Sequence, residues 1–301
     1  MTDTRTTPPG FPNFFLIGAP KSGTTALSEY LRQHPDIGFS EPKEPHYFND
    51  DFSSRHTYSL DEYMKCFPPA SAGKAAIGEG SVFYLSSKSA VSNVLRCAPD
   101  ARFIVMLRNP VHAAHSFYWQ AVHSHGEDIT QFEQAWIAQY DRAQGRRLPR
   151  HNRVREALQY GSLFKYGEQL ERLYDVAPRH RVQVILYDDF KTDTNRIYVE
   201  ALDFLGVPRI ELKEYRIINP GKRYRHTSAE AVSRIVGKVK QTLGITGGFG
   251  AMTRLRAWNT THEERPRLSD TFKHQLRDYY RADIVKAAKL IERDLGAWLG
   301  G

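Results

Sequence analysis

The sequence predicts an α/β fold: a single domain in which a central parallel sheet is flanked by helices. Three observations carry this prediction. Short apolar or β-rich runs without polar alternation recur along the chain, which is typical of strands buried on both faces. Segments with helical spacing separate these runs, and strands that alternate with helices favour a parallel sheet. The chain of 301 residues, 41% of them hydrophobic, is long enough to bury a large core.

The first strand and the first helix enclose a loop of small residues. Residues 1–13 are rich in Thr, Pro and Gly, and we expect a flexible arm there, ahead of one domain that spans 14–301. Residues 14–19 form a continuous apolar run and predict a buried strand. Residues 26–33 carry apolar side chains at helical spacing, and a proline follows soon after. The segment GAPKSGTT, residues 18–25, therefore connects a strand to a helix.

Two more pairs of strand and helix are expected in the middle of the chain. Residues 75–80 predict a weak strand, and residues 86–97 predict the helix that follows it. Residues 103–107 are wholly apolar and predict a central parallel strand. Pro110 fits the first turn of the next helix, which we expect to run to about residue 125.

The second half of the chain predicts one further strand and several helices. The strand is expected over 182–187, and Gly206 marks the end of a helix because glycine favours helix C-termini. Helices are expected over 130–144, 162–176, 192–205 and 268–295. The stretch 228–265 holds a basic segment with helical spacing and then the glycine-dense GITGGFGAM. We expect a mobile lid there, with a plain surface loop as the alternative.

Composition excludes several classes of protein. The apolar runs are far shorter than the ~18 residues that suggest a membrane span, and the N-terminus has no apolar signal-peptide core. Two cysteines, Cys66 and Cys97, do not make a disulfide framework. We therefore expect a cytoplasmic protein.

The formal net charge of +8 favours an anionic partner. A nucleic acid is not expected, because zinc-finger spacings, an RNP-like aromatic strand and an obvious helix-turn-helix are lacking. An anionic small molecule can use the same charge. Oligomeric state cannot be read from the sequence.

The loop after the first strand has the chemistry of an anion site. Backbone N–H groups and the dipole at the start of a helix favour an anion. Lys21, Ser22, Gly23, Thr24 and Thr25 stand at that place and add an ammonium group and hydroxyls. The nucleotide-triphosphatase pattern G-x-x-x-x-G-K-[ST] is not matched, because the lysine precedes the glycine.

A second candidate pair is Arg108 with Ser116. Arg108 stands where the strand over 103–107 ends, and ligands of open α/β sheets bind at the carboxyl ends of strands. Ser116 follows on the next helix, about two turns on, so both side chains can face one phosphate.

A third candidate segment is SEPKEPHYF, residues 40–48, which can fold back over the anion loop. A carboxylate there can act as a general base toward a hydroxyl group, and a neighbouring histidine can orient it. The residues leave three candidates for the base: Glu41, Glu44 and His46. A solvated loop of mixed charge is the alternative.

Together these segments resemble the sulfotransferase superfamily, in the branch of heparan-sulfate-type enzymes and their bacterial relatives. FFLIGAPKSGTTAL is similar to the strand, loop and helix that bind the 5′-phosphosulfate in that family, and RNPVHAAHSFYW is similar to its 3′-phosphate segment. EPKEPHYF resembles the segment with the catalytic glutamate. The C-terminal LSDTFKHQLRDYYRADIVKAAKLIERDL also looks like that branch.

The resemblance implies a donor, 3′-phosphoadenosine 5′-phosphosulfate (PAPS), and no metal. It implies that Lys21 to Thr25 bind the 5′-phosphosulfate and that Arg108 and Ser116 bind the 3′-phosphate. NPGKRYR, residues 219–225, is similar to a late basic loop, which implies donor contacts for Arg223 and Arg225. Glu44 matches the family's base, and His46 matches its neighbouring histidine.

Two departures concern the acceptor. Heparan-type enzymes tend to carry a lysine after the glutamate of the second strand, whereas Gly80 follows Glu79 here. The chain also inserts residues 228–265, so that this stretch becomes a candidate lid or acceptor-site insertion.

The resemblance implies in-line transfer of a sulfuryl group from PAPS to a hydroxyl group of a carbohydrate, lipid or small-metabolite acceptor. Glu44 would take the hydroxyl proton, and Lys21 would stabilise charge on the leaving oxygen. Two alternatives stand beside it. One is a non-catalytic protein that binds a 3′,5′-bisphosphate nucleotide, and the other is an ATP-dependent kinase that needs magnesium.

Overall fold

A five-stranded, fully parallel sheet forms the centre of the computed structural model. The structure describes residues 8–53, 59–150, 152, 154–216, 223–224, 260–261 and 266–300. The strand order is β2-β3-β1-β4-β5. The strands are β1 (Phe14–Gly18), β2 (Ile37–Phe39), β3 (Ala76–Glu79), β4 (Arg102–Leu107) and β5 (Val182–Leu186). The predicted fold class is confirmed.

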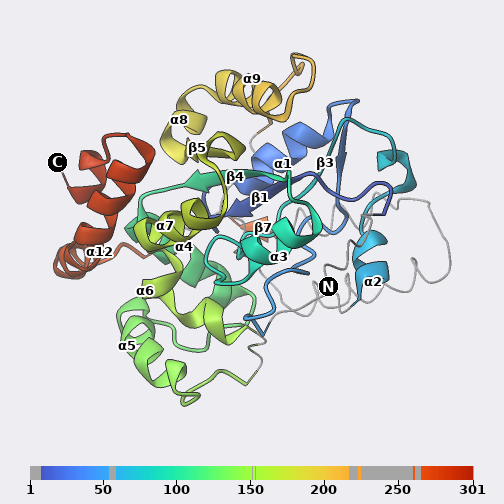
Figure 1. Ribbon diagram of the computed structural model, residues 1–301. Coiled ribbons are helices and arrows are strands. Elements are labelled where there is room, and N and C mark those ends of the chain that lie inside the picture. The colour runs from blue at the N-terminus through green and yellow to red at the C-terminus, as the bar shows by residue number, and fades with distance from the viewer. Residues whose placement is uncertain are drawn as a thin grey trace. The chain divides into compact units, whose positions relative to one another are not determined.

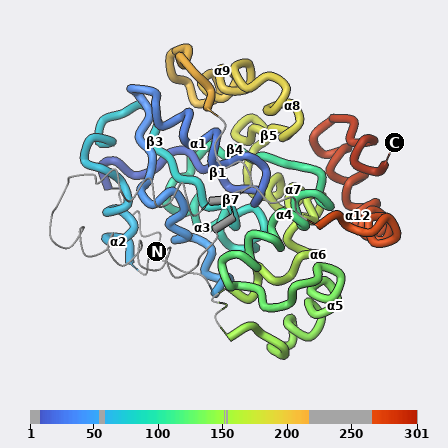
Figure 2. Tube along the Cα trace, turned by 180° about the vertical axis from the view of Figure 1, so that it is seen from behind, coloured from blue at the N-terminus to red at the C-terminus, as the bar shows by residue number. Residues whose placement is uncertain are grey.

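Helices cover both faces of this sheet (Figure 1, Figure 2). On one side lie α1 (Thr24–Arg32), α8 (Tyr187–Thr192) and α9 (Thr194–Leu205). On the other lie α3 (Ala90–Cys97), α4 (Pro110–His123), α7 (Tyr166–Val176) and α12 (Asp270–Ile291). Two-sided cover explains why β1 is buried throughout and β4 is buried beyond Arg102, without polar alternation.

The ends of two helices follow the expected sequence signals. Pro110 is the first residue of α4, and the side chain of Asn109 accepts hydrogen bonds from the N–H groups of Val111 and His112 at 3.0 and 3.4 Å. Helix α9 ends at Gly206, which has the left-handed conformation typical of a glycine at that position.

Some boundaries differ from the sequence-based expectation. The helix expected over 86–97 begins only at Ala90, because Asp51 binds the turn that precedes it. The carboxylate of Asp51 accepts from the hydroxyl of Ser87 at 2.5 Å and from the N–H of Lys88 at 2.8 Å. The helix expected over 162–176 is divided into α6 (Tyr160–Leu163) and α7.

Several short elements were not expected from the sequence, among them β2, α2 (Leu60–Met64) and α8. Strand β2 pairs only with β3, at the edge of the sheet, and three residues are too few for a periodic signal. Helix α2 is likewise brief. The helix expected over 130–144 is present as α5 (Phe132–Ala143).

The chain divides into two compact units, one of residues 1–216 with 268–301 and one of residues 217–267. Of the second unit, the structure describes little more than the antiparallel pair β6 (Arg223–Tyr224) and β7 (Thr260–Thr261). Most of the stretch 228–265 lies outside the described residues, so its role as a lid or insertion stays a prediction. Of the expected arm over 1–13, the described part includes Phe11, whose ring contacts Phe48 and Tyr63.

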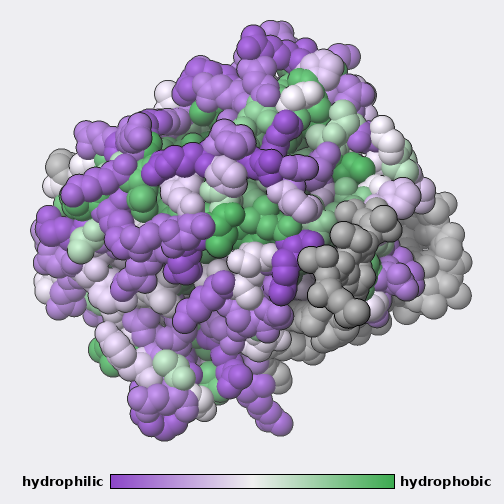
Figure 3. All heavy atoms as spheres, in the orientation of Figure 1, coloured by the Kyte–Doolittle hydropathy of each residue, from purple (hydrophilic) through white to green (hydrophobic). Residues whose placement is uncertain are grey.

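The surface of the first unit is largely polar on the face shown in Figure 3, with apolar atoms gathered in a strip across its middle. A shallow groove between α3 and α7 is lined in part by Val91, Leu173 and Val176. None of the helices in the described ranges is long and apolar enough to cross a membrane.

Candidate active site

The loop between β1 and α1 presents the start of a helix at the carboxyl end of the sheet. Gly23 is the N-cap of α1 and has a φ of 94°, in the left-handed region that favours glycine. A Cβ there would lie 3.2 Å from Cδ2 of Tyr187 and 3.3 Å from Cε of Met106, so the neighbours leave little room for a side chain. The helix dipole and the backbone N–H groups of its first turn make this a place for an anion.

The hydroxyl residues of the loop differ in exposure. Ser22 and Thr24 are buried, whereas Thr25 is half-buried and its carbonyl accepts from the hydroxyl of Ser28 at 2.9 Å. Lys21 is half-buried and has a φ of 65°. Turns that mix left-handed and right-handed residues direct successive N–H groups to one side and favour anions.

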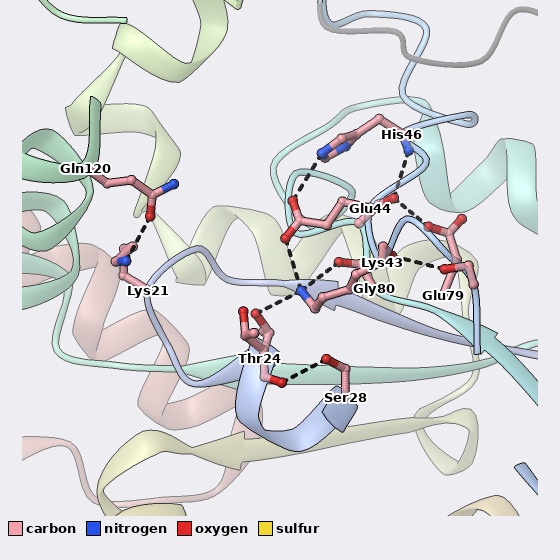
Figure 4. Close-up of polar contacts among 12 residues, drawn as sticks. Lys21, Thr24, Ser28, Lys43, Glu44, His46, Glu79, Gly80 and Gln120 are labelled. Atoms are coloured by element: carbon pink, nitrogen blue, oxygen red, sulfur yellow. Dashed lines mark hydrogen bonds and ion pairs between the residues drawn. The ribbon is translucent and has the colours of Figure 1, made fainter. Parts of the chain in front are cut away.

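Lys21 points toward α4, where its Nζ donates to Oε1 of Gln120 at 2.8 Å (Figure 4). Gln120 follows Ser116 by four residues, so both side chains lie on one face of the helix. Ser116 is buried on that face. The structure therefore places the Lys21 loop and the Ser116 face of α4 together.

Arg108 follows the last residue of β4 and returns to the same loop. Its Nη1 donates to the carbonyl oxygen of Lys21 at 3.3 Å, and its guanidinium lies 4.7 Å from the centre of the Tyr187 ring. Because β1 and β4 are neighbours in the sheet, Lys21 and Arg108 meet at one edge. Two cationic side chains thus stand beside the start of α1.

Glu44 lies between two nitrogen donors (Figure 4). Its Oε1 is 3.0 Å from Nζ of Lys43, and its Oε2 is 3.2 Å from Nε2 of His46. The Glu44 side chain keeps 34% of its surface exposed, so a substrate group can reach it. Burial raises the pKa of Glu44, but the charge of Lys43 and the hydrogen bond from His46 outweigh it and lower the pKa to about 2.

Lys43 connects Glu44 to the anion loop. Its Nζ also donates to Oγ1 of Thr24 at 3.3 Å and to the carbonyl oxygen of Gly80 at 3.0 Å. The carboxylate, the ammonium group and the first residue of α1 therefore form one connected chain of contacts. A carboxylate so placed can take a proton from a hydroxyl group that approaches an anion bound in the loop.

A buried carboxylate at the end of β3 anchors the segment that carries Glu44 and His46. Glu79 is 0% exposed, and its Oε1 accepts from the hydroxyls of Tyr63 at 3.0 Å and Tyr84 at 2.9 Å. Its Oε2 accepts a short hydrogen bond from the hydroxyl of Ser81. Burial raises the pKa of Glu79, although the three hydroxyl donors oppose this effect.

Two of those hydroxyls also bind the backbone of the segment. Ser81 Oγ accepts from the N–H of His46 at 2.9 Å. Tyr84 accepts from the N–H groups of Tyr47 at 2.9 Å and Phe48 at 3.1 Å. His46 has a φ of 52°, which is uncommon for a residue other than glycine, and these bonds hold it there. Its ring stacks on Phe83, with centroids 5.2 Å apart.

The remaining candidates from the sequence are not brought into this site by the described residues. Glu41 is exposed. Arg223 is described only as backbone in β6, in the second unit, and Arg225 lies outside the described residues. Among the residues that the structure describes, no group of three or more His, Cys, Asp or Glu side chains is arranged to hold a metal ion.

Sequence reasoning missed four residues of this site. Gln120 could have been found, because it lies one helical turn after Ser116. Lys43 precedes Glu44, but the sequence gives no sign that its ammonium group reaches Thr24. Glu79 contacts Tyr63, 16 positions earlier, and Tyr187 contacts Arg108 from the other half of the chain, and only the folded structure reveals these contacts.

Comparisons with known proteins show what the chain is similar to. The model of the sulfotransferase domain family matches residues 11–237. The chain is 28% identical over 297 residues to human bifunctional heparan sulfate N-deacetylase/N-sulfotransferase 3, and the match covers 96% of this chain and 31% of that protein. It is 26% identical over 290 residues to mouse heparan sulfate glucosamine 3-O-sulfotransferase 3A1, and the match covers 96% of this chain and 65% of that protein. It thus spans less than two thirds of either relative.

A solved structure is similar over nearly the whole of both chains. The sulfotransferase from Alicyclobacillus acidocaldarius superposes with a TM-score of 0.72 at 27% identity, and the match covers 95% of this chain and 98% of that one.

Proposed function

The chain belongs to the sulfotransferase domain family, and from that premise we propose that it moves a sulfuryl group from PAPS to an acceptor hydroxyl group. Membership of the family and the resemblance to heparan-sulfate-type enzymes support the transfer of sulfate as such. The observation that carries the finer proposal is the placement of Glu44, which Lys43 links to Thr24 at the start of α1.

The donor is proposed to bind along the loop and across to α4. Lys21 to Thr25 hold the 5′-phosphosulfate, with the dipole of α1 behind them. Arg108 and Ser116 hold the 3′-phosphate, and the ring of Tyr187 keeps the guanidinium of Arg108 in place. Arg223 and Arg225 would add contacts from the later basic segment.

Glu44 is proposed as the general base. The oxygen of the acceptor hydroxyl forms a bond to sulfur, and its proton passes to Glu44. The bond from sulfur to the bridging oxygen breaks, and 3′-phosphoadenosine 5′-phosphate leaves with that electron pair on its 5′-phosphate. Lys21 stabilises the charge that grows there. His46 orients the carboxylate of Glu44, whereas Glu41 is exposed and lacks such a partner among the contacts described.

The acceptor is proposed to be a hydroxyl group of a carbohydrate, a lipid or a small metabolite. The names of the heparan sulfate relatives favour a carbohydrate as the first class to test. The departure at Gly80 and the stretch 228–265 both bear on the acceptor, so the test begins with the donor.

Calorimetric titration tests the donor site directly. We expect 3′-phosphoadenosine 5′-phosphate to bind about 10- to 100-fold more tightly than 5′-AMP, because charge-assisted hydrogen bonds to the 3′-phosphate contribute about 1.5–3 kcal/mol. Arg108→Met is expected to remove most of that preference, whereas Arg281→Met, a control at an exposed ion pair on α12, keeps it. Tighter binding of ATP with magnesium would contradict the proposal and favour a kinase.

Transfer of labelled sulfate from PAPS to a panel of sugars, lipids and phenols then separates an enzyme from a binding protein. Tight binding of the bisphosphate without transfer to any acceptor would favour the non-catalytic alternative.

Positioning of the catalytic segment can be tested with two matched tyrosine variants. Tyr84→Phe and Tyr63→Phe each remove one hydroxyl bond to Glu79, but only Tyr84 also holds the backbone of Tyr47 and Phe48. We expect Tyr84→Phe to lower kcat by about 10- to 100-fold, because displacement of a catalytic group by about 1 Å costs that much. Tyr63→Phe is expected to change kcat by less than about threefold. Equal kcat values for the two variants would contradict the assignment.

A further inference from the structure

Lys43 has a position that the proposed roles of Lys21 and Glu44 leave unexplained. We propose that Lys43 is a second catalytic cation, which moves from Glu44 to the transferring sulfuryl group when PAPS binds. The inference rests on the proposed function and extends it: donor binding releases the base at the moment when the base is needed.

The contacts of Lys43 place its charge between the donor loop and the base. An ammonium group has three N–H donors, and Nζ of Lys43 has three acceptors: the carboxylate of Glu44, the carbonyl of Gly80 and the hydroxyl of Thr24. Its side chain is only 13% exposed. A shielded lysine with all donors engaged has a defined position, unlike the mobile ammonium groups of a protein surface.

The geometry of sulfuryl transfer places the sulfuryl group beside the ammonium group of Lys43. In a near-attack arrangement the acceptor oxygen lies about 3–3.5 Å from sulfur. The same oxygen must lie within about 3 Å of Glu44 to give up its proton. The sulfuryl group therefore lies between the start of α1 and Glu44, and Lys43 bridges those two points at 3.3 and 3.0 Å. Its ammonium group is the cation that the sulfuryl oxygens meet there.

The movement of Lys43 from Glu44 to the sulfuryl group also explains how a carboxylate with a low pKa can serve as the base. A general base works best when its pKa lies near the working pH, but Lys43 and His46 together hold the pKa of Glu44 at about 2. When Lys43 turns to the anionic sulfuryl group, Glu44 loses one of its two stabilising partners. Burial, which raises its pKa, then opposes only His46, and Glu44 becomes a stronger base.

Gly80 makes room for this lysine. A Cβ at that position would lie 2.9 Å from Cε and 3.2 Å from Cγ of Lys43. An alanine at position 80 would therefore push the flexible end of the lysine aside while it leaves the charge in the chain. This provides a second variant that tests position separately from charge.

The experiment compares two ligands that differ only in the sulfuryl group. Calorimetry on the full chain, with PAPS and with 3′-phosphoadenosine 5′-phosphate, is run for the parent, Lys43→Met, Gly80→Ala and the exposed control Lys88→Met. We expect Lys43→Met to weaken PAPS binding at least about 10-fold and bisphosphate binding less than about threefold. Gly80→Ala is expected to show the same selective loss, and Lys88→Met neither loss.

Equal losses for both ligands in Lys43→Met, or no loss for either, would overturn the inference, because a merely structural lysine does not distinguish them. Failure of the parent to bind either ligand would instead overturn the proposed function. A pH profile adds a second readout with any acceptor found by the screen. The parent's kcat/KM for PAPS, which reports the enzyme before PAPS binds and Lys43 moves, is expected to stay level down to about pH 5, because Lys43 and His46 lower the pKa of Glu44 there. Lys43→Met lacks one of these partners, so its kcat/KM for PAPS is expected to begin to fall at a higher pH than that of the parent. Profiles that coincide would also overturn the inference.

Discussion

Replacement of Glu44 by glutamine is expected to lower kcat for sulfuryl transfer by about 10²- to 10⁴-fold, the range for loss of a general base. Glutamine has nearly the same shape, and its amide oxygen can still accept from Lys43. It cannot take a proton from the acceptor hydroxyl at neutral pH. Binding of 3′-phosphoadenosine 5′-phosphate is expected to change by less than about threefold, because Glu44 is proposed to face the acceptor and not the donor. Steady-state kinetics and calorimetry on the same preparation give the two values.

Two variants in the same segment serve as comparisons for Glu44. Glu41→Gln is expected to retain nearly full activity, because Glu41 is exposed and is not among the groups around Lys43. His46→Asn is expected to lower kcat by less than Glu44→Gln, since in the proposed mechanism His46 orients the carboxylate through its hydrogen bond and does not itself take the proton. If Glu44→Gln lowered donor affinity as much as it lowered kcat, Glu44 would be a donor ligand and not the base.

Replacement of Lys21 by alanine is expected to affect both donor binding and turnover. Lys21 stands in the loop before α1, and its ammonium group can leave Gln120 for the phosphosulfate. We expect donor affinity to fall by about 10- to 100-fold. We expect kcat to fall by a further ~10²- to 10³-fold, since a group aimed at developing charge contributes about 3–4 kcal/mol. The measurements are PAPS binding by calorimetry and single-turnover transfer.

Gln120→Leu provides the comparison for Lys21. It removes the amide oxygen that accepts from the ammonium group but leaves the charge itself, so we expect a much smaller loss of kcat than in Lys21→Ala. Lys21→Arg is expected to restore part of the donor affinity, because it keeps a cation in the loop. If Lys21→Ala bound PAPS and turned over like the parent, the assignment of this loop to the donor would be wrong.

The fold, and the placement of the loop before α1 beside Arg108, could be predicted from the sequence because their signals are local. Phe14 to Thr25 contain the strand, the turn and the helix start within twelve consecutive positions. Arg108 and Pro110 likewise stand together at the end of an apolar strand, and helix α4 begins there. Strand burial and helix capping act over a few residues, so composition and spacing reveal them.

The surroundings of Glu44 could be predicted less well, because the residues that form them are brought together by the sheet. Strand β3 lies between β1 and β2 in space although it follows both in the chain, and it brings Glu79 and Gly80 beside residues 43–48. The link from Lys43 to Thr24 spans 19 positions and depends on the space above Gly80. Periodicity and spacing in the chain carry no information of this kind.

The burial of Glu79 also determines whether this residue makes the free energy of unfolding rise or fall with pH. Its pKa is higher in the folded chain than the ~4.3 of an unfolded chain, because burial outweighs its three hydroxyl donors. The folded state thus holds a proton that the unfolded state releases. The contribution of this group to stability is fully present below pH ~4 and is lost as the pH rises through the folded-state pKa. Acid therefore favours the anchor of the segment that carries Glu44 and His46, whereas acid weakens surface ion pairs because it protonates their carboxylates.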